Sequence, residues 1–329
     1  MRVKLVQIDG KLPNLALMRL SAWHKARGDA VTFTRETSHD LFEPAYDRVY
    51  GSAIFRFSAD KIARLRATYP EAIIGGTGTD NPATIGVGPG TLDYGLYPSY
   101  EPSLGFTQRG CRLSCKFCVV PGKEGKNRSV ATILDIWRGD GHPKKLHLLD
   151  NDFFGQEHWR ERVAEIRAGG FKVCLNQGIN VRHLTPEAAE ALASIEYRDD
   201  AFQERRVYTA WDNLKDEALF FRGLDMMEAA GIPAKHVMAY MLVGYDKRET
   251  MERVMHRFSR MTERGVQPYP MVFDCRATAP DRYRELKRLQ RWACTGLYRA
   301  VPFEDYDANR KTSRAKPERG ADLFAFEST

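Results

Sequence analysis

Short apolar runs typical of β-strands alternate along most of this chain with segments typical of helices. In residues 1–90, strand-like runs such as "RVKLVQI" and "AVTFT" are separated by helix-like segments such as "ADKIARLRATYP". Parallel strands need a long crossover connection, usually a helix, so this alternation predicts parallel sheets covered by helices. We therefore expect an α/β protein that begins with a small, Rossmann-like parallel sheet.

The alternation resumes on a larger scale after a stretch rich in Gly, Pro and Tyr at residues 91–102. Six strand-like runs follow it, namely "LGFTQR", "KKLHLLD", "FKVCLN", "RRVYTAW", "HVMAYMLV" and "YPMVFD". Six β/α units in series predict a six-stranded partial (β/α) barrel, with its chemistry at the carboxyl ends of the strands. The predicted division is a Rossmann-like domain (1–90), a linker (91–102), a partial barrel (103–280) and a C-terminal helix and tail (281–329).

Composition restricts the class of protein further. No apolar run approaches the ~18 residues that a membrane span needs, so we expect a cytoplasmic protein without a membrane partner. Six cysteines in 329 residues are too few for a disulfide scaffold. In a reducing compartment, clustered thiols instead indicate metal binding or catalysis. The net charge of +7 permits anionic partners without requiring them.

Half of the cysteines lie in one loop, "RGCRLSCKFCVVPGKEG", which follows the first strand-like run of the second domain. Cys111, Cys115 and Cys118 have the spacing C-x-x-x-C-x-x-C. A structural zinc site usually has four ligands in two pairs, and the nearest downstream histidines, His142 and His147, do not have zinc-finger spacing. Three cysteines can instead bind a [4Fe-4S] cluster and leave one iron without a protein ligand. The spacing favours the cluster, with zinc as the alternative.

This spacing, after the first strand of a β/α series, resembles the radical SAM superfamily. The resemblance implies that S-adenosylmethionine (SAM) binds the open iron and is cleaved to a 5′-deoxyadenosyl radical, which abstracts hydrogen from a substrate. It also implies a six-stranded partial barrel and a low-potential electron donor of the flavodoxin or ferredoxin type. Phe117, the aromatic residue before the third cysteine, would pack beside the adenine of SAM.

The N-terminal region is similar to radical SAM proteins that have a cobalamin-binding domain in front of the barrel. Such domains usually carry a histidine that binds cobalt, but the loop "DGKLPNLALM" after the first strand contains none. We therefore expect the fold of that domain without its cobalamin. The stretches "LLDNDFFG", "LNQGINVRHLT" and "TAWDNLKDE" are similar to a poorly characterised bacterial and phage subgroup, which indicates no substrate.

Polar residues at the ends of three barrel strands are candidate ligands of SAM. They are Asp150, Asn151 and Asp152 after the second strand, Asn176, Gln177 and Arg182 after the third, and Asp212 after the fourth. At the end of the second strand, the superfamily usually has a Gly-Gly-Glu-like element that binds the amino group of SAM. These glycines are missing here. Arg182 would pair with the carboxylate of SAM, and Asp212 would accept hydrogen bonds from its ribose. The alternative for each residue is a helix cap or a solvated side chain.

Two further features bear on the substrate. Cys275, just after the last strand-like run, is the candidate for a radical relay. Arg284, Lys287, Arg288 and Arg291 recur at helical spacing and predict one basic helix face, whereas Leu286, Leu289 and Ala293 predict a buried stripe. Such a face beside the barrel would attract an anionic substrate, such as a nucleotide or nucleic acid, although charged runs are usually solvated. The alternative function is a non-catalytic nucleic-acid-binding protein stabilised by zinc or by a cluster.

Overall fold

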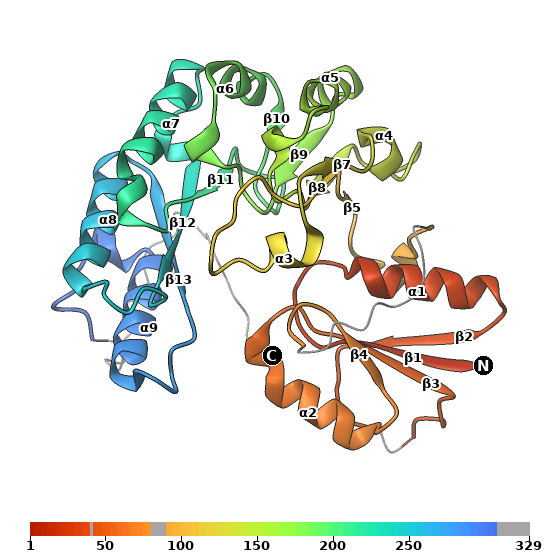
Figure 1. Cartoon of the computed structure of the whole chain (residues 1–329). Coiled ribbons are helices and arrows are strands. Elements are labelled where there is room, and N and C mark those ends of the chain that lie inside the picture. Colours follow the sequence, from red (N-terminus) through yellow and green to blue (C-terminus); the bar gives the residue numbers. More distant parts are fainter. Residues whose placement is uncertain (40–41, 80–89, 308–329) are drawn as a thin grey trace, which may run out of the picture.

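The computed structural model describes residues 1–39, 42–79 and 90–307 (Figure 1). Part of the predicted first domain (80–89) and of the predicted tail (308–329) therefore lies outside the described residues. Among the residues that are described, no helix combines the length and the apolar character that crossing a bilayer would require.

The chain begins with a parallel sheet in the spatial order β2-β1-β3-β4. Its strands are β1 (Arg2–Gln7), β2 (Ala30–Thr34), β3 (Arg48–Ser52) and β4 (Ile73–Gly75). Helices α1 (Leu15–Ala26) and α2 (Ala59–Thr68) cover its two faces (Figure 1). Side chains alternate along β1, so Leu5 packs with α1 and Val6 packs with α2. The predicted N-terminal parallel sheet is confirmed.

Two further parallel sheets follow, in the orders β10-β9-β8-β5 and β11-β12-β13. Their strands are β5 (Ser103–Gly105), β8 (Lys145–Leu148), β9 (Lys172–Leu175), β10 (Glu196–Tyr197), β11 (Val207–Ala210), β12 (Val237–Val243) and β13 (Gln267–Val272). A short antiparallel pair joins β6 (Gln108–Arg109) to β7 (Arg128–Ser129). The predicted α/β class is confirmed, and the described residues form no closed barrel.

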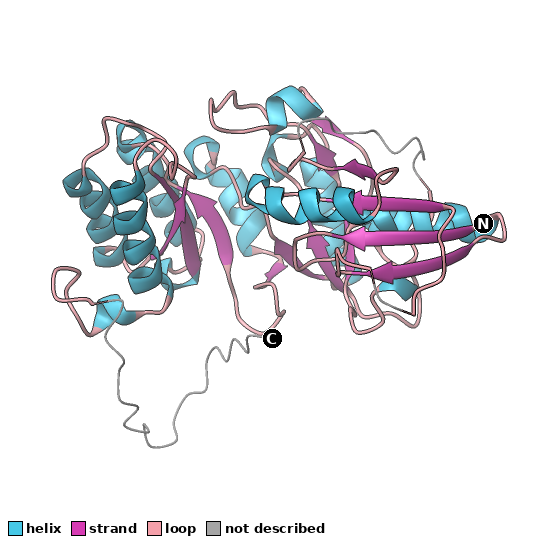
Figure 2. Ribbon diagram, turned by 90° about the horizontal axis from the view of Figure 1, so that it is seen from below, coloured by secondary structure: helices cyan, strands magenta, loops and turns pink. Residues whose placement is uncertain are grey.

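Helices cover one side of these two sheets, as Figures 1 and 2 show. The helices of this region are α3 (Val120–Glu124), α4 (Ile133–Ile136), α5 (Trp159–Gly169), α6 (Pro186–Ala193), α7 (Glu217–Ala229), α8 (Met251–Glu263) and α9 (Pro280–Cys294). Local sequence explains some boundaries: Pro186 suits the first turn of α6, and the Thr185 hydroxyl accepts a hydrogen bond from the Ala188 N–H.

The strands present different residues to their two sides. Leu146, Val173 and Val237 belong to one large core that also contains residues of the covering helices. Because side chains alternate along a strand, their neighbours, such as Cys174, lie on the opposite side of the sheet. Figure 1 shows α3 on this other side, toward the N-terminal sheet. The cysteine loop therefore lies on the side without covering helices.

The predicted linker is tied to both of the regions that it connects. The hydroxyl of Tyr97 accepts a hydrogen bond from the Asn14 N–H and donates one to Gln7 Oε1, at 3.1 and 2.7 Å. The hydroxyl of Tyr94 accepts the Leu104 N–H of β5 at 2.9 Å. Tyrosines in this segment therefore contact the N-terminal sheet and the first strand of the second region.

Candidate functional site

The three clustered cysteines lie in a loop that is closed by the β6–β7 pair. Arg109 pairs with Arg128 across this short ladder, so residues 110–127 form the enclosed loop. Gly110 has a φ of +81°, and a Cβ atom there would lie 2.2 Å from the carbonyl oxygen of Lys126. Only glycine suits this close approach without strain. The backbone at the start of the loop therefore sets the position of Cys111.

The three thiols are free and partly accessible. Cys111 and Cys115 are half-buried, and Cys118 is exposed. Burial raises the pKa of the Cys111 thiol, and the Asp152 carboxylate and the two other thiols act in the same direction. Burial also raises the pKa of Cys118, together with Cys115, Asp212 and Glu124. These surroundings disfavour the thiolate forms of Cys111 and Cys118, and a bound metal would stabilise them.

The spacing of the sulfur atoms is a test of which metal centre fits. Among the described residues, the three sulfur atoms do not all lie within 4.8 Å of one another. One tetrahedral zinc ion, with Zn–S bonds of about 2.3 Å, would hold its sulfur ligands about 3.8 Å apart. In a [4Fe-4S] cluster each cysteine binds a different iron, so the sulfurs lie farther apart. A single ion shared by all three sulfur atoms would therefore require at least one of these side chains to move.

Asp150 connects the end of β8 to the strand that precedes the cysteine loop. Its Oδ1 accepts hydrogen bonds from the backbone N–H groups of Thr107 and Gln108, at 2.7 and 3.0 Å, and the Thr107 hydroxyl donates to its Oδ2. Burial raises the pKa of Asp150 to about 7, although these three donors act in the opposite direction. Asp150 thus binds donors of the chain itself, and its contact with SAM stays a prediction.

Asp152 and Asn151 hold the loop from the same strand end. Arg112 Nε and Nη2 lie 2.7 and 3.0 Å from the two carboxylate oxygens of Asp152, whose side chain is 1% exposed. Asn151 donates a hydrogen bond to Glu124 at 3.0 Å, and Glu124 also accepts the Gly110 N–H. These contacts fix the residues on either side of the first cysteine. They account for the acidic run after β8, and the roles of Asn151 and Asp152 in binding SAM stay predictions.

Arg182 is brought directly to the cysteine loop. It lies in a short 3-10 turn after β9, and its Nη2 is 3.7 Å from the sulfur of Cys115. Its Nη1 forms an ion pair of 2.8 Å with Asp216. Gln177, by contrast, is exposed and donates a hydrogen bond to Asn176, whose own amide donates to Asp200. Of the candidates after β9, only Arg182 is shown in contact with a cysteine of the loop.

Asp212 lies at the end of β11, where the adjoining strand fixes its orientation. Its Oδ1 accepts the Leu242 N–H of β12 at 2.9 Å. Burial raises the pKa of Asp212. Its charge also raises the pKa of Cys118, so this carboxylate lies within electrostatic reach of the loop. The contact of Asp212 with the ribose of SAM stays a prediction.

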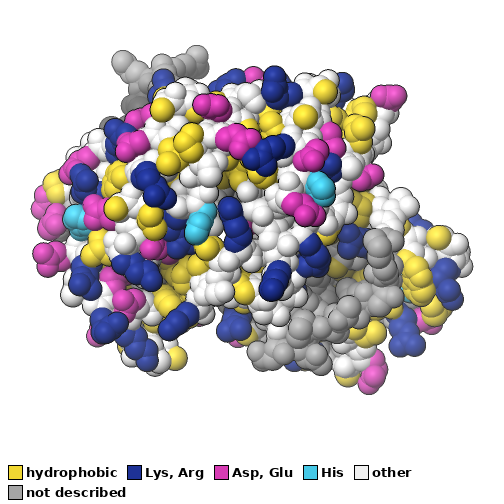
Figure 3. Space-filling view, turned by 45° about the horizontal axis from the view of Figure 1, so that its top comes forward, with side chains coloured by type: hydrophobic (Ala, Val, Ile, Leu, Met, Phe, Trp, Pro, Cys, Tyr) yellow, Lys and Arg dark blue, Asp and Glu magenta, His cyan; other side chains and the backbone are white. Residues whose placement is uncertain are grey.

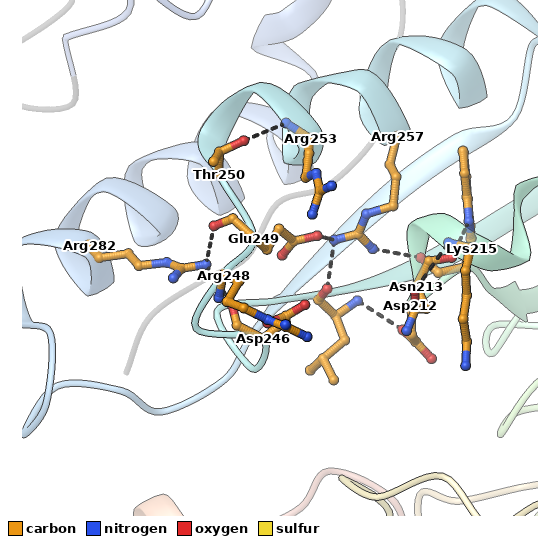
Figure 4. A network of polar contacts seen from close by, with 12 residues as sticks. Asp212, Asn213, Lys215, Asp246, Arg248, Glu249, Thr250, Arg253, Arg257 and Arg282 are labelled. Carbon is orange, nitrogen blue, oxygen red and sulfur yellow. Dashed lines mark hydrogen bonds and ion pairs between the residues drawn. The ribbon is translucent and has the colours of Figure 1, made fainter.

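A buried arginine, which the sequence analysis missed, supports this strand end (Figure 4). Arg257 of α8 donates to the carbonyl oxygens of Trp211 and Leu242, at 2.8 and 2.9 Å, and pairs with Glu249. Its side chain is 0% exposed. One guanidinium group therefore holds Leu242, which donates to Asp212, and Trp211, which precedes Asp212 in the chain. The only sequence signal is an arginine on the apolar side of α8.

Aromatic side chains from three segments meet beside the loop. The ring of Phe117 stands edge-on to Tyr245 at 5.6 Å, and Tyr245 contacts Phe273 at 5.1 Å. Tyr245 and Phe273 follow β12 and β13, and each is more than a third exposed. Of these three rings, only that of Phe117 was predicted from the sequence. The signal for the other two is their position just after a strand. Cys275 lies nearby in the chain, 3.6 Å from the place of a Cβ on Gly244.

Arg284 and Arg288, predicted on one basic face of α9, have partners within the chain. Arg288 donates to the carbonyl oxygens of Tyr306 and Phe303, at 2.7 and 2.5 Å, and so fastens the segment after α9. Arg284 pairs with Asp281. The predicted buried stripe of Leu286, Leu289 and Ala293 is confirmed. On the face drawn in Figure 3, basic and acidic side chains are interspersed. An anionic substrate stays a prediction.

Comparisons with protein families, with curated proteins and with solved structures gave no match to this chain.

Proposed function

We propose that this chain is a radical SAM enzyme. The observation that carries the proposal is one loop that holds three free thiols at the spacing C-x-x-x-C-x-x-C. The loop follows β5, the first strand of a parallel series, and is contacted by residues from the ends of β8 and β9. The ends of parallel strands are the usual place for chemistry in β/α folds.

We infer that the two sheets after the linker, β10-β9-β8-β5 and β11-β12-β13, act together as a six-stranded partial barrel. The strands β5, β8, β9, β11, β12 and β13 are parallel to their neighbours within each sheet. The sheets adjoin after β9, where the Ile179 N–H donates to the carbonyl oxygen of Tyr208 in β11 at 2.8 Å. This bond supports one continuous strand order, which would direct the strand ends toward the cysteine loop.

Each residue of the site has a distinct role in this proposal. When bound, a [4Fe-4S] cluster supplies the electron that cleaves SAM to a 5′-deoxyadenosyl radical, which abstracts hydrogen from the substrate. Cys111, Cys115 and Cys118 would hold three of its irons. Arg182, beside Cys115, would pair with the SAM carboxylate. Asp212 would accept a hydrogen bond from the ribose.

Other residues of the site would position these groups and exclude water. Phe117 and Tyr245 would pack against the adenine, because an exposed aromatic pair offers apolar contact area. Asp150 and Asp152 would keep the cysteine loop in place. The electron would come from a low-potential donor of the flavodoxin or ferredoxin type. Cobalamin is not part of the proposal, because the loop after β1, "DGKLPNLALM", contains no histidine to bind cobalt.

Anaerobic reconstitution with iron and sulfide tests the proposal. The wild type should bind about four irons per chain and, after reduction, convert SAM to 5′-deoxyadenosine, measured by chromatography. Cys115→Ala should lose both properties, whereas Cys294→Ala, outside the loop, should keep them. Bound zinc that depends on Cys115, without any iron, would contradict the proposal. That result would favour a zinc-stabilised nucleic-acid-binding protein.

A further inference from the structure

A second group of metal-binding side chains lies apart from the cysteine loop. His147 of β8 and Cys174 of β9 are paired in register on neighbouring strands, and Asp200 follows β10. One ligand atom from each lies within 4.8 Å of the other two. His147 and Cys174 are buried, at 2% and 0% exposure, whereas the Asp200 side chain is half exposed. The site is thus built into the sheet and open on one side.

Two of the three distances between ligand atoms match those that a tetrahedral ion requires, and the third is within 4.8 Å. His147 Nε2 and Cys174 Sγ each lie 3.6 Å from Asp200 Oδ1. Zinc bonds of about 2.0–2.1 Å to nitrogen or oxygen and about 2.3 Å to sulfur place tetrahedral ligand atoms about 3.3–3.6 Å apart. An ion could therefore bind with little movement of these side chains.

Neighbouring residues orient the three side chains. The hydroxyl of Tyr100 lies 2.5 Å from His147 Nδ1, and the hydroxyl of Tyr208 donates to Asp200 Oδ2 at 3.1 Å. Asn176 donates to Asp200 Oδ1. With the Nδ1–H bound to Tyr100, the lone pair on Nε2 would be available to a metal. Polar partners of this kind typically fix the ligands of metal sites.

The ligand set also satisfies the charge balance of a buried site. A divalent ion with one thiolate, one carboxylate and a neutral imidazole has no net charge, so burial carries little electrostatic cost. Thiolate and imidazole ligands suit zinc. We propose that His147, Cys174 and Asp200 bind one Zn²⁺, with a water as the fourth ligand.

The ion would fasten the loop between β10 and β11 to the strands. This loop contains Phe202, the one non-glycine residue of the described chain with a positive φ, at 59°. Its ring packs edge-on against His147 at 4.7 Å. A strained residue persists where its surroundings hold it. Without an ion, the contact of His147 Nε2 with the Asp200 carbonyl oxygen would be a hydrogen bond, and the experiment distinguishes these two states.

Cobalt is the probe, because Co²⁺ occupies zinc sites and reports thiolate ligands by its absorption. The experiment uses the full chain with Cys115→Ala, which disables the cysteine loop and makes the result independent of the proposed enzyme. We expect one Co²⁺ per chain, with a thiolate charge-transfer band and the visible bands of tetrahedral cobalt. Stoichiometric Zn²⁺ should displace it, and mass spectrometry of metals should then find one zinc per chain.

Two further substitutions in that background assign the ligands. Cys174→Ala should remove the charge-transfer band, and Asp200→Asn should weaken cobalt binding at least tenfold. Asp199→Asn is the matched control and should change neither, because an amide oxygen can still accept the Gln203 and Glu204 N–H groups. Absence of the band in the Cys115→Ala protein, or its persistence with Cys174→Ala, would overturn the proposal. If Cys174→Ala does not fold, the substitution of the half-exposed Asp200 decides: cobalt binding by Asp200→Asn as tight as in the Cys115→Ala protein would overturn the proposal.

Discussion

Individual polar residues beside the cysteine loop differ in what they bind. Asp150 is surrounded by donors of the chain itself, and Arg182 contacts both a thiol and a carboxylate. The first arrangement serves to position the loop, whereas the second leaves a cation beside the thiols. The two residues therefore call for different measurements: stability for Asp150 and ligand affinity for Arg182.

Asp150→Asn should change how stability depends on pH. Burial raises the folded-state pKa of Asp150 to about 7, compared with about 3.9 in an unfolded chain. The protonated carboxyl group therefore stabilises the folded state fully below about pH 4, and this contribution is lost as the pH rises through 7. Between pH 5 and 8 the wild type should lose about 2–3 kcal/mol more than Asp150→Asn.

Urea unfolding of both proteins at several pH values measures this difference. The comparison cancels the titration of all other groups, since only position 150 differs. Parallel stability profiles between pH 5 and 8 would show that Asp150 is already ionised in the folded protein at pH 5.

Arg182→Gln should weaken SAM binding by about tenfold or more, because a hydrogen bond to a charged group contributes about 1.5–3 kcal/mol. Iron content should stay unchanged. Equilibrium binding of SAM to the reconstituted protein measures the affinity. Arg222→Gln is the control, because Arg222 donates a hydrogen bond to the carbonyl oxygen of Arg182, whereas the Arg182 side chain itself lies beside Cys115. Equal affinities for the wild type and Arg182→Gln would remove Arg182 from the SAM site.

The strands and helices around the site hold its loop and strand ends in place. The cysteine loop depends on the short β6–β7 pair, and the ends of β11 and β12 depend on α8 through Arg257. Neither dependence involves a residue that would touch SAM or substrate. Substitutions in these elements should therefore act on folding and on cluster retention first.

Gly110→Ala should disrupt the cysteine loop. Gly110 has a positive φ, and a Cβ atom would collide with the Lys126 carbonyl oxygen at 2.2 Å. Iron bound after reconstitution should fall severalfold. Gly122→Ala is the matched control, since a Cβ there meets no atom within 4 Å. If both variants retained the same iron content, the backbone at Gly110 would not control the loop.

Arg257→Met should destabilise the fold by about 3–5 kcal/mol, because it leaves the Glu249 carboxylate and two carbonyl oxygens without their buried partner. Urea unfolding measures the loss. Arg253→Met, one turn earlier on α8 and exposed, should cost less than about 0.5 kcal/mol. Similar losses in the two variants would show that the buried network contributes little.

At the scale of the whole molecule, the segment 91–102 joins the N-terminal sheet to the strands of the second region. Its tyrosine hydroxyls bind both sides, and Lys123 of α3 also donates to Thr77 of the N-terminal region at 2.5 Å. The cysteine loop is thus tied directly to both parts of the chain. Removing the hydrogen bonds of segment 91–102 should therefore lower the stability of the entire molecule.

Tyr97→Phe tests whether segment 91–102 stabilises the fold. It removes the partner of the Asn14 N–H and of Gln7 Oε1, so the free energy of unfolding should fall by about 1–3 kcal/mol. Tyr298→Phe is the control, since the Tyr298 hydroxyl makes no hydrogen bond within the described residues. Thermal and urea unfolding report both. An unchanged stability for Tyr97→Phe would mean that this segment connects the regions without supporting them.

Periodicity along the chain was enough to predict the α/β class, the N-terminal parallel sheet and the buried stripe of α9. These features depend on neighbours a few residues apart, because hydrophobic side chains must reach the core at the period of the strand or helix. The cysteine spacing is local in the same sense. It predicts a metal centre without reference to any distant residue.

The partners of the polar side chains depended on the tertiary structure. Helical spacing placed Arg288 on an exposed face of α9, but the returning chain brings the carbonyl oxygens of Phe303 and Tyr306 to it. Likewise, His147, Cys174 and Asp200 are separated by more than 25 residues each in sequence and meet only because β8 and β9 pair in register. A buried polar group must find a partner wherever the fold provides one. The path of the chain between strands decides where that partner lies, and a local sequence pattern does not predict it.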